Sequence, residues 1–143
     1  MNSAEIFIDD LITKVARQSR YHVGLGLLRE VYGKYRAGVR TRNLPIDGFR
    51  PELIANNQKG QVYRHLQLHV GLHLLGGPFI LLSQAANLID LHQAGKGRPE
   101  SETELLDNYA ALLCANKVLS YYRAHLPYEE LRRELKDILT IDN

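Results

Sequence analysis

Three histidines at four-residue intervals are the strongest chemical signal in the sequence. His65, His69 and His73 all lie within residues 61–75, QVYRHLQLHVGLHLL, which we call the histidine helix. At roughly 100° per residue, a helix places the three rings within about 80° of arc on one face. Two imidazoles one turn apart can bind a single metal ion such as zinc. The spacing therefore favours a divalent-metal site, although histidines buried in a core as neutral structural residues fit it as well.

Carboxylates further along the chain are the natural partners of these rings. Zinc needs three or four ligands, and the donors available beside the histidine pair are Asp90, Glu104, Asp107 and His73. The predicted metal ligands are His65, His69 and Asp90. Without a metal, a buried carboxylate would orient a histidine and raise its pKa for general acid–base work. The predicted catalytic residues are His65, His69, Asp90, Glu104 and Asp107, and the predicted pocket also contains Arg64, Asn87 and Asn108.

Several well-known catalytic motifs are absent. Leu66 stands where the H-E-x-x-H metalloprotease motif has its glutamate, and the chain has neither a G-x-S-x-G elbow nor a C-x-x-C pair. The one cysteine, Cys114, lies in an apolar run and reads as a small buried hydrophobe. The residues thus indicate a polar pocket without naming a reaction.

The histidine helix is apolar over most of its circumference, which is typical of a helix surrounded by others. Apolar periodicity and glycine or proline breaks predict further helices at about 3–19, 22–35, 78–94, 101–124 and 127–139, with a helical turn at 51–55. Ser3 is the predicted N-cap of the first helix, and Ser101 with Glu104 reads as a capping box. The prediction is an all-α, single-domain bundle of five to six helices covering residues 1–143.

Residues 38–60 form a long connection rich in glycine, proline and asparagine. Basic residues lie in and just before it: Lys34, Arg36, Arg40, Arg42 and Arg50. They could bind phosphate or nucleic acid through residues 34–50, but aromatic side chains for stacking are few, and a solvated loop is the simpler interpretation. Nucleic acid is therefore the less favoured partner.

Composition indicates a soluble protein. The apolar fraction is 45%, the net charge is +2, and the most apolar stretch is too interrupted for a membrane span. The N-terminus lacks the features of a signal peptide. We expect a cytoplasmic protein, or one delivered by a secretion system that needs no signal peptide.

The order of motifs over residues 60–115 adds a family resemblance. Arg64-His65-x-x-x-His69, then Asp90-x-His92-Gln93, then Glu104-x-x-Asp107-Asn108 resembles an uncharacterised helical domain of bacterial polymorphic-toxin and cell-wall-associated proteins. The resemblance implies that His65, His69, Asp90 and Asp107-Asn108 line one pocket. Gln93 and Tyr109 depart from the family pattern, which has a carboxylate and a second asparagine there. His73 has no counterpart in the pattern.

These observations support one leading hypothesis and two alternatives. The leading hypothesis is a small, effector-like hydrolase that acts on a small-molecule substrate through a metal-assisted or a histidine acid–base mechanism. The first alternative is a non-enzymatic adaptor or immunity-type protein that binds another protein and whose histidines are structural. The second alternative is a nucleic-acid binder.

Overall fold

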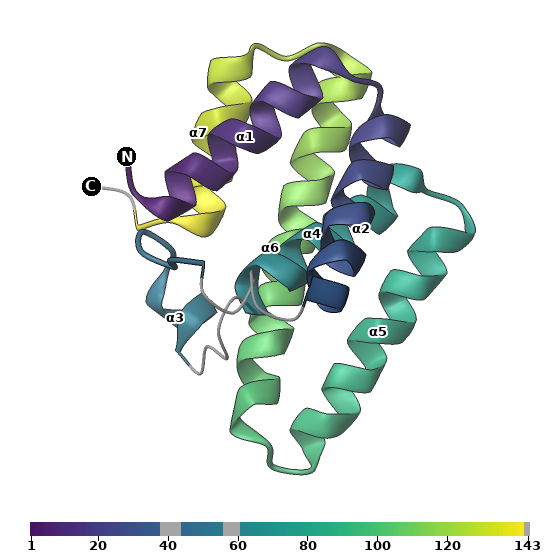
Figure 1. Ribbon diagram of the computed structural model, residues 1–143, viewed down its shortest axis with the longest axis vertical. Helices are drawn as coiled ribbons and strands as arrows, with labels where there is room; N and C mark the ends of the chain where they lie inside the picture. Colours follow the sequence, from purple (N-terminus) through teal and green to yellow (C-terminus); the bar gives the residue numbers. More distant parts are fainter. Residues whose placement is uncertain (38–43, 56–60, 142–143) are drawn as a thin grey trace.

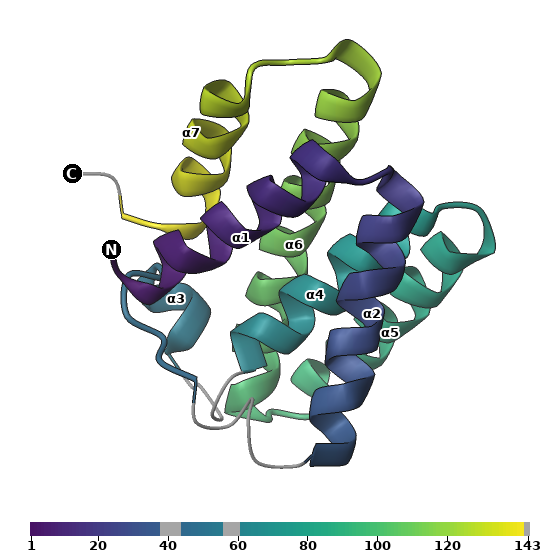
Figure 2. The same ribbon diagram turned by 45° about the horizontal axis from the view of Figure 1, so that its top comes forward.

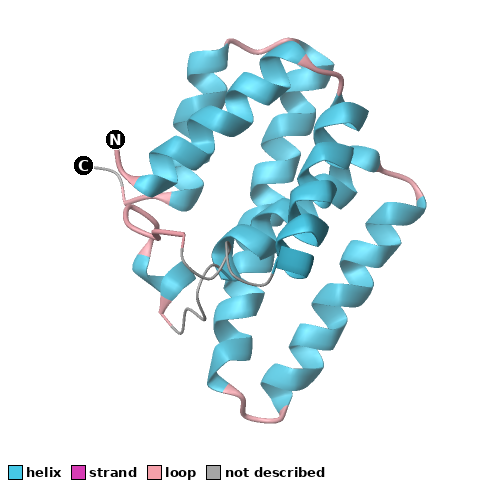
Figure 3. Ribbon diagram, in the orientation of Figure 1, coloured by secondary structure: helices cyan, strands magenta, loops and turns pink. Residues whose placement is uncertain are grey.

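The computed structural model describes residues 1–37, 44–55 and 61–141. In this part of the chain every named element is a helix, which confirms the predicted all-α class (Figures 1 and 3). The elements are α1 (Ser3–Arg17), α2 (Arg20–Ala37), α3 (Pro51–Ile54), α4 (Gln61–Leu75), α5 (Pro78–Gly95), α6 (Pro99–Ala124) and α7 (Tyr128–Leu139). The described part thus has seven helices, one more than the predicted five to six, because the expected turn at Pro51 is long enough to count as a helix.

Helix α4 is the histidine helix, and it lies between α2 and α6 with α5 beside it (Figures 1 and 2). Its apolar side chains account for this central position: Leu66 and Leu74 are fully buried and Val70 is 2% exposed. Burial of side chains of this size stabilises a fold by roughly 1.5–3 kcal/mol each. Burial of these apolar side chains therefore holds α4 in the interior of the bundle, and the histidines on the same helix are placed there as well.

Two glycines set the crossing of α2 and α4. A Cβ atom on Gly24 would lie 2.9 Å from the backbone oxygen of Gly71, and one on Gly71 would lie 3.0 Å from the oxygen of Gly24. Any larger residue would force the two helices apart. Gly24 therefore serves close backbone packing, which offsets its low intrinsic helix propensity.

Two predictions about the N-terminal ends of helices are wrong. Asn2, rather than Ser3, caps α1 through a 2.9 Å hydrogen bond from the Glu5 backbone N–H to its side-chain oxygen. Ser3 lies inside the helix and donates its hydroxyl to Asp47 instead. Helix α6 begins at Pro99 with Arg98 as N-cap, so the predicted capping box at Ser101 is wrong. Proline fits the first turn because it needs no N–H partner there.

The two ends of the described chain meet around α3. Helix α1 packs against α7 (Figure 1). Phe49 forms an isolated bridge with Thr140. The Arg50 guanidinium donates to the carbonyl oxygens of Asp137 (2.6 Å) and Ile138 (3.2 Å), the last turn of α7. None of the helices in the described part of the chain combines the length and apolar character that a membrane crossing needs.

Candidate functional site: a histidine–carboxylate cluster between α4, α5 and α6

Asn108 of α6 connects the histidine helix to α5. Its side-chain oxygen lies 2.6 Å from His65 Nδ1, and its amide nitrogen donates to Asp90 Oδ2 (2.8 Å) and Asn87 Oδ1 (3.1 Å). Asn108 is fully buried, so these bonds have little competition from water. The predicted pocket residues His65, Asn87, Asp90 and Asn108 are therefore brought together.

This network assigns the protons on His65. Because the Asn108 amide donates to two oxygens, its own oxygen is the acceptor that faces His65, and Nδ1 must carry the hydrogen. Burial lowers the pKa of His65, and the nearby Arg64 charge lowers it further, against the raising effects of Asn108 and Asp90. A neutral His65 with its proton on Nδ1 keeps a lone pair on Nε2, which is the form that binds metals or accepts protons.

Glu104 completes a group that could hold a cation. One ligand atom each from His65, Asp90 and Glu104 lies within 4.8 Å of the others, and all three side chains are half-buried. One imidazole and two carboxylates, contributed by α4, α5 and α6, form a donor set suited to zinc and similar divalent ions.

His69 and His73 have a different partner, Ser83 of α5. The Ser83 hydroxyl lies 2.7 Å from His69 Nδ1 and 3.1 Å from His73 Nε2. His69 is 1% exposed, and burial, followed by the nearby His65, lowers its pKa to about 4. Its ring centroid is 6.2 Å from that of His65, and its Nε2 has no hydrogen-bond partner. His69 thus borders the cluster as a neutral ring.

Asp107 is buried on the neighbouring turn of α6. Its side chain has no exposed surface, and neither carboxyl oxygen has a hydrogen-bond partner. Burial raises its pKa to about 8; the Glu104 charge adds to the increase and the neighbouring Gln61 amide opposes it. Asp107 is therefore mostly protonated at neutral pH, unlike a metal-binding carboxylate.

Ser83 is a neighbour of the histidines that the predicted site omitted. Its signal was present in the sequence, since Ser83, Asn87 and Asp90 recur at helical spacing along one face of an otherwise apolar helix. Each of the three contacts a residue of the cluster or of the histidine helix.

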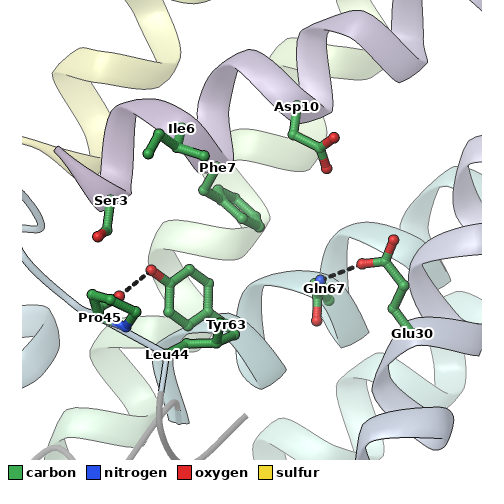
Figure 4. Close-up of a pocket in the computed structure, with 9 residues that line it drawn as sticks. All are labelled: Ser3, Ile6, Phe7, Asp10, Glu30, Leu44, Pro45, Tyr63 and Gln67. Atoms are coloured by element: carbon green, nitrogen blue, oxygen red, sulfur yellow. Dashed lines mark hydrogen bonds between the residues drawn. The ribbon is translucent and has the colours of Figure 1, made fainter. Parts of the chain in front are cut away.

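A cavity lies on the side of α4 opposite the histidine cluster. It has a volume of about 380 Å³ between α1, α2 and α4 (Figure 4). Tyr63 and Gln67 face it from α4, two residues before His65 and His69 and hence roughly 200° away around the helix. Tyr63 donates its hydroxyl to the Pro45 carbonyl, and Gln67 donates to Glu30 at 2.7 Å. This cavity is therefore separate from the histidine cluster.

The basic residues proposed to bind nucleic acid are only partly described. Arg40 and Arg42 lie outside the described residues, and the side chains of Lys34 and Arg36 do as well. Arg50 is described, and its guanidinium is bonded to the end of α7. The Arg50 side chain thus holds the end of α7 in place through hydrogen bonds to backbone carbonyl groups.

Comparison of the chain with protein-family models, with curated proteins and with solved structures finds no match.

Proposed function

We propose that the protein is a small, effector-like hydrolase whose site holds a divalent metal ion between His65, Asp90 and Glu104. The observation that carries the proposal is the convergence of one imidazole and two carboxylates from three helices within 4.8 Å. Imidazole nitrogen and carboxylate oxygen are the donor atoms that zinc and similar divalent ions take from proteins, and here they converge from three helices.

The surroundings support this assignment. Asn108 bonds to both His65 and Asp90, which is how outer residues commonly fix the orientation of metal ligands. A neutral His65 needs to lose no proton before it binds a metal. His65, Asp90 and Glu104 would hold the ion, and the ion would supply an activated water as the nucleophile for hydrolysis.

The roles of the other predicted catalytic residues follow from their environments. His69, with a pKa of about 4, is a poor general base at neutral pH, so we assign it to packing the histidine helix against α5. Asp107, with a pKa of about 8, is the group that could donate a proton near neutral pH. We keep it as a candidate acid rather than as a ligand.

A binding protein with structural histidines is the second candidate. The observation that favours it is that His65, His69 and His73 each have a side-chain hydrogen-bond partner on α5 or α6. Such a protein would act as an adaptor or immunity protein, and its variants at His65 would alter stability alone.

Expression in a bacterial host separates the two candidates. We expect the wild-type protein, produced in the cytoplasm or exported to the periplasm, to arrest growth, and His65→Ala and Glu104→Gln to relieve the arrest. Glu102→Gln, at an exposed acid on the same helix, is the matched control and should remain toxic. Circular dichroism checks that each variant folds. Normal growth with the wild-type protein in both compartments, or toxicity that survives both site variants, would reject the hydrolytic effector.

A further inference from the structure

Helix α5 has its polar side turned towards the bundle and its apolar side turned away from it. Ser83 is buried, and Asn87 and Asp90 join the network with Asn108. Large apolar residues that are 39 to 64% exposed lie on the outward side, namely Leu81, Leu82, Leu88 and Ile89, and towards its two edges, namely Phe79 and Leu91. Figure 1 shows α5 at the edge of the bundle, with no other described helix on that side. This arrangement reverses the usual pattern of a surface helix.

The size of this outward face calls for a partner. Half-exposed side chains of this kind present roughly 600 Å² together, the upper end of the range for the largest apolar patch on a typical monomer. A stable protein–protein interface takes about 800 Å² from each partner. Residues next to the outward face, such as the exposed Gln84, could supply the remainder.

The pattern along the face is symmetric about Ala85. Leu81 and Leu82 precede it by four and three residues, and Leu88 and Ile89 follow it by three and four. A two-fold axis at Ala85 would pair two α5 helices antiparallel, with the leucines before Ala85 in one copy against the residues after it in the other. The small alanine side chain allows the helices to approach closely at their crossing.

We propose that the outward face of α5 is a homodimer interface formed by two copies of this chain. Asp90 is the only charged residue between Pro78 and Gly95, and it faces inward, so no like charges meet across the axis. Helices that lie on membranes carry lysine or arginine on their polar side, and α5 has neither. The dimer would also cover the helix that supplies Asn87 and Asp90 to the cluster. This proposal stands independently of the hydrolase assignment.

Sedimentation velocity over about 1 to 100 µM protein measures the association. We expect a dimer, and we expect Ile89→Glu to raise its dissociation constant about 100-fold, because each of the two copies buries an unpaired charge. Ile6→Glu is the matched control: Ile6 is 55% exposed on α1 and Ile89 is 58% exposed on α5. The control should dimerise like the wild type. Circular dichroism confirms that both variants keep their helical content.

Disulfide trapping tests the geometry of the pair. In Ala85→Cys, oxidised glutathione should accept the two electrons and two protons released as the thiols of two copies join in one disulfide. Glu129→Cys, exposed on α7, should cross-link far more slowly, and native Cys114 is buried. A monomer at every concentration, equal weakening by Ile6→Glu, or equal cross-linking of the two cysteine variants would overturn the proposal. Binding of the monomer to phosphatidylcholine vesicles without dimerisation would assign the face to lipid instead.

Discussion

Replacing Asp107 with asparagine should change how the stability of the protein depends on pH. The carboxyl pKa is 3.8 in its ordinary state and about 8 in the folded protein, where burial disfavours the charge. Between these values the folded state holds a proton that the unfolded state has released. The free energy of unfolding therefore decreases as pH rises, by about 1.4 kcal/mol per pH unit for this group. Its contribution is fully present below the unfolded pKa and is lost as pH rises through the folded pKa.

His69 acts in the opposite direction over part of the same range. Its pKa falls from 6.5 to about 4 on folding, so its contribution to stability increases as pH rises between those values. The two effects nearly cancel up to about pH 6.5 in the wild type, and above that Asp107 alone lowers stability. Asp107→Asn removes only the Asp107 contribution.

Urea denaturation followed by circular dichroism, in buffer with EDTA, measures this difference. From pH 5 to pH 7 the stability of Asp107→Asn relative to wild type should increase by about 3 kcal/mol. Glu102→Gln, at an exposed acid of the same helix, should follow the wild-type curve. A constant difference between wild type and Asp107→Asn across this range would refute the assignment of a buried, protonated Asp107.

Further predictions concern packing and the hydrogen-bond network, and urea denaturation measures each. Gly24→Ala should destabilise the protein by about 1–3 kcal/mol because its Cβ would meet backbone at 2.9 Å, whereas Gly26→Ala, with open space around it, should stabilise it by about 0.5–1 kcal/mol. Equal effects would contradict the close crossing. Ser83→Ala should cost about 1–2 kcal/mol because His69 Nδ1 loses its partner. Asn108→Ala should cost about 3 kcal/mol because it breaks three hydrogen bonds made by a buried side chain; a loss below 1 kcal/mol would show that the network contributes little.

Apolar periodicity was sufficient to predict the central helix. The bounds of α4, Gln61–Leu75, are those expected from the sequence, because a run that is apolar on nearly every side and ends at two glycines has few alternatives. The predicted N-cap of α1 was wrong by one residue. Asn2 and Ser3 are both good capping residues, and the choice depends on Asp47, 44 residues away, which binds the Ser3 hydroxyl. Local pattern contains no information about that contact.

The candidate site was predictable in its members and less so in its grouping. The spacing placed His65, His69 and His73 on one face, but it does not distinguish which of the three rings lies next to the carboxylates. Which ring meets the carboxylates depends on where α5 and α6 cross α4. The structure brings Glu104 to His65 and Asp90, and it places Ser83 beside the other two rings. Gly24 is a second example of what the sequence alone does not reveal. Helix propensity shows only that a glycine destabilises the helix, whereas the close approach of α2 to Gly71 explains why a glycine is needed there.

Zinc titration of the metal-free protein by isothermal titration calorimetry tests the central claim most directly. We predict about one zinc ion per chain for the wild type. Glu104→Gln and Asp90→Asn should each weaken the affinity at least 100-fold, because each replaces a charged ligand, and the exposed-site control Glu102→Gln should bind like the wild type. Two results would contradict a metal site at His65, Asp90 and Glu104. One is the absence of binding heat for the wild type at neutral pH, both in direct titration and in competition with a weak chelator. The other is equal zinc affinity in all four proteins.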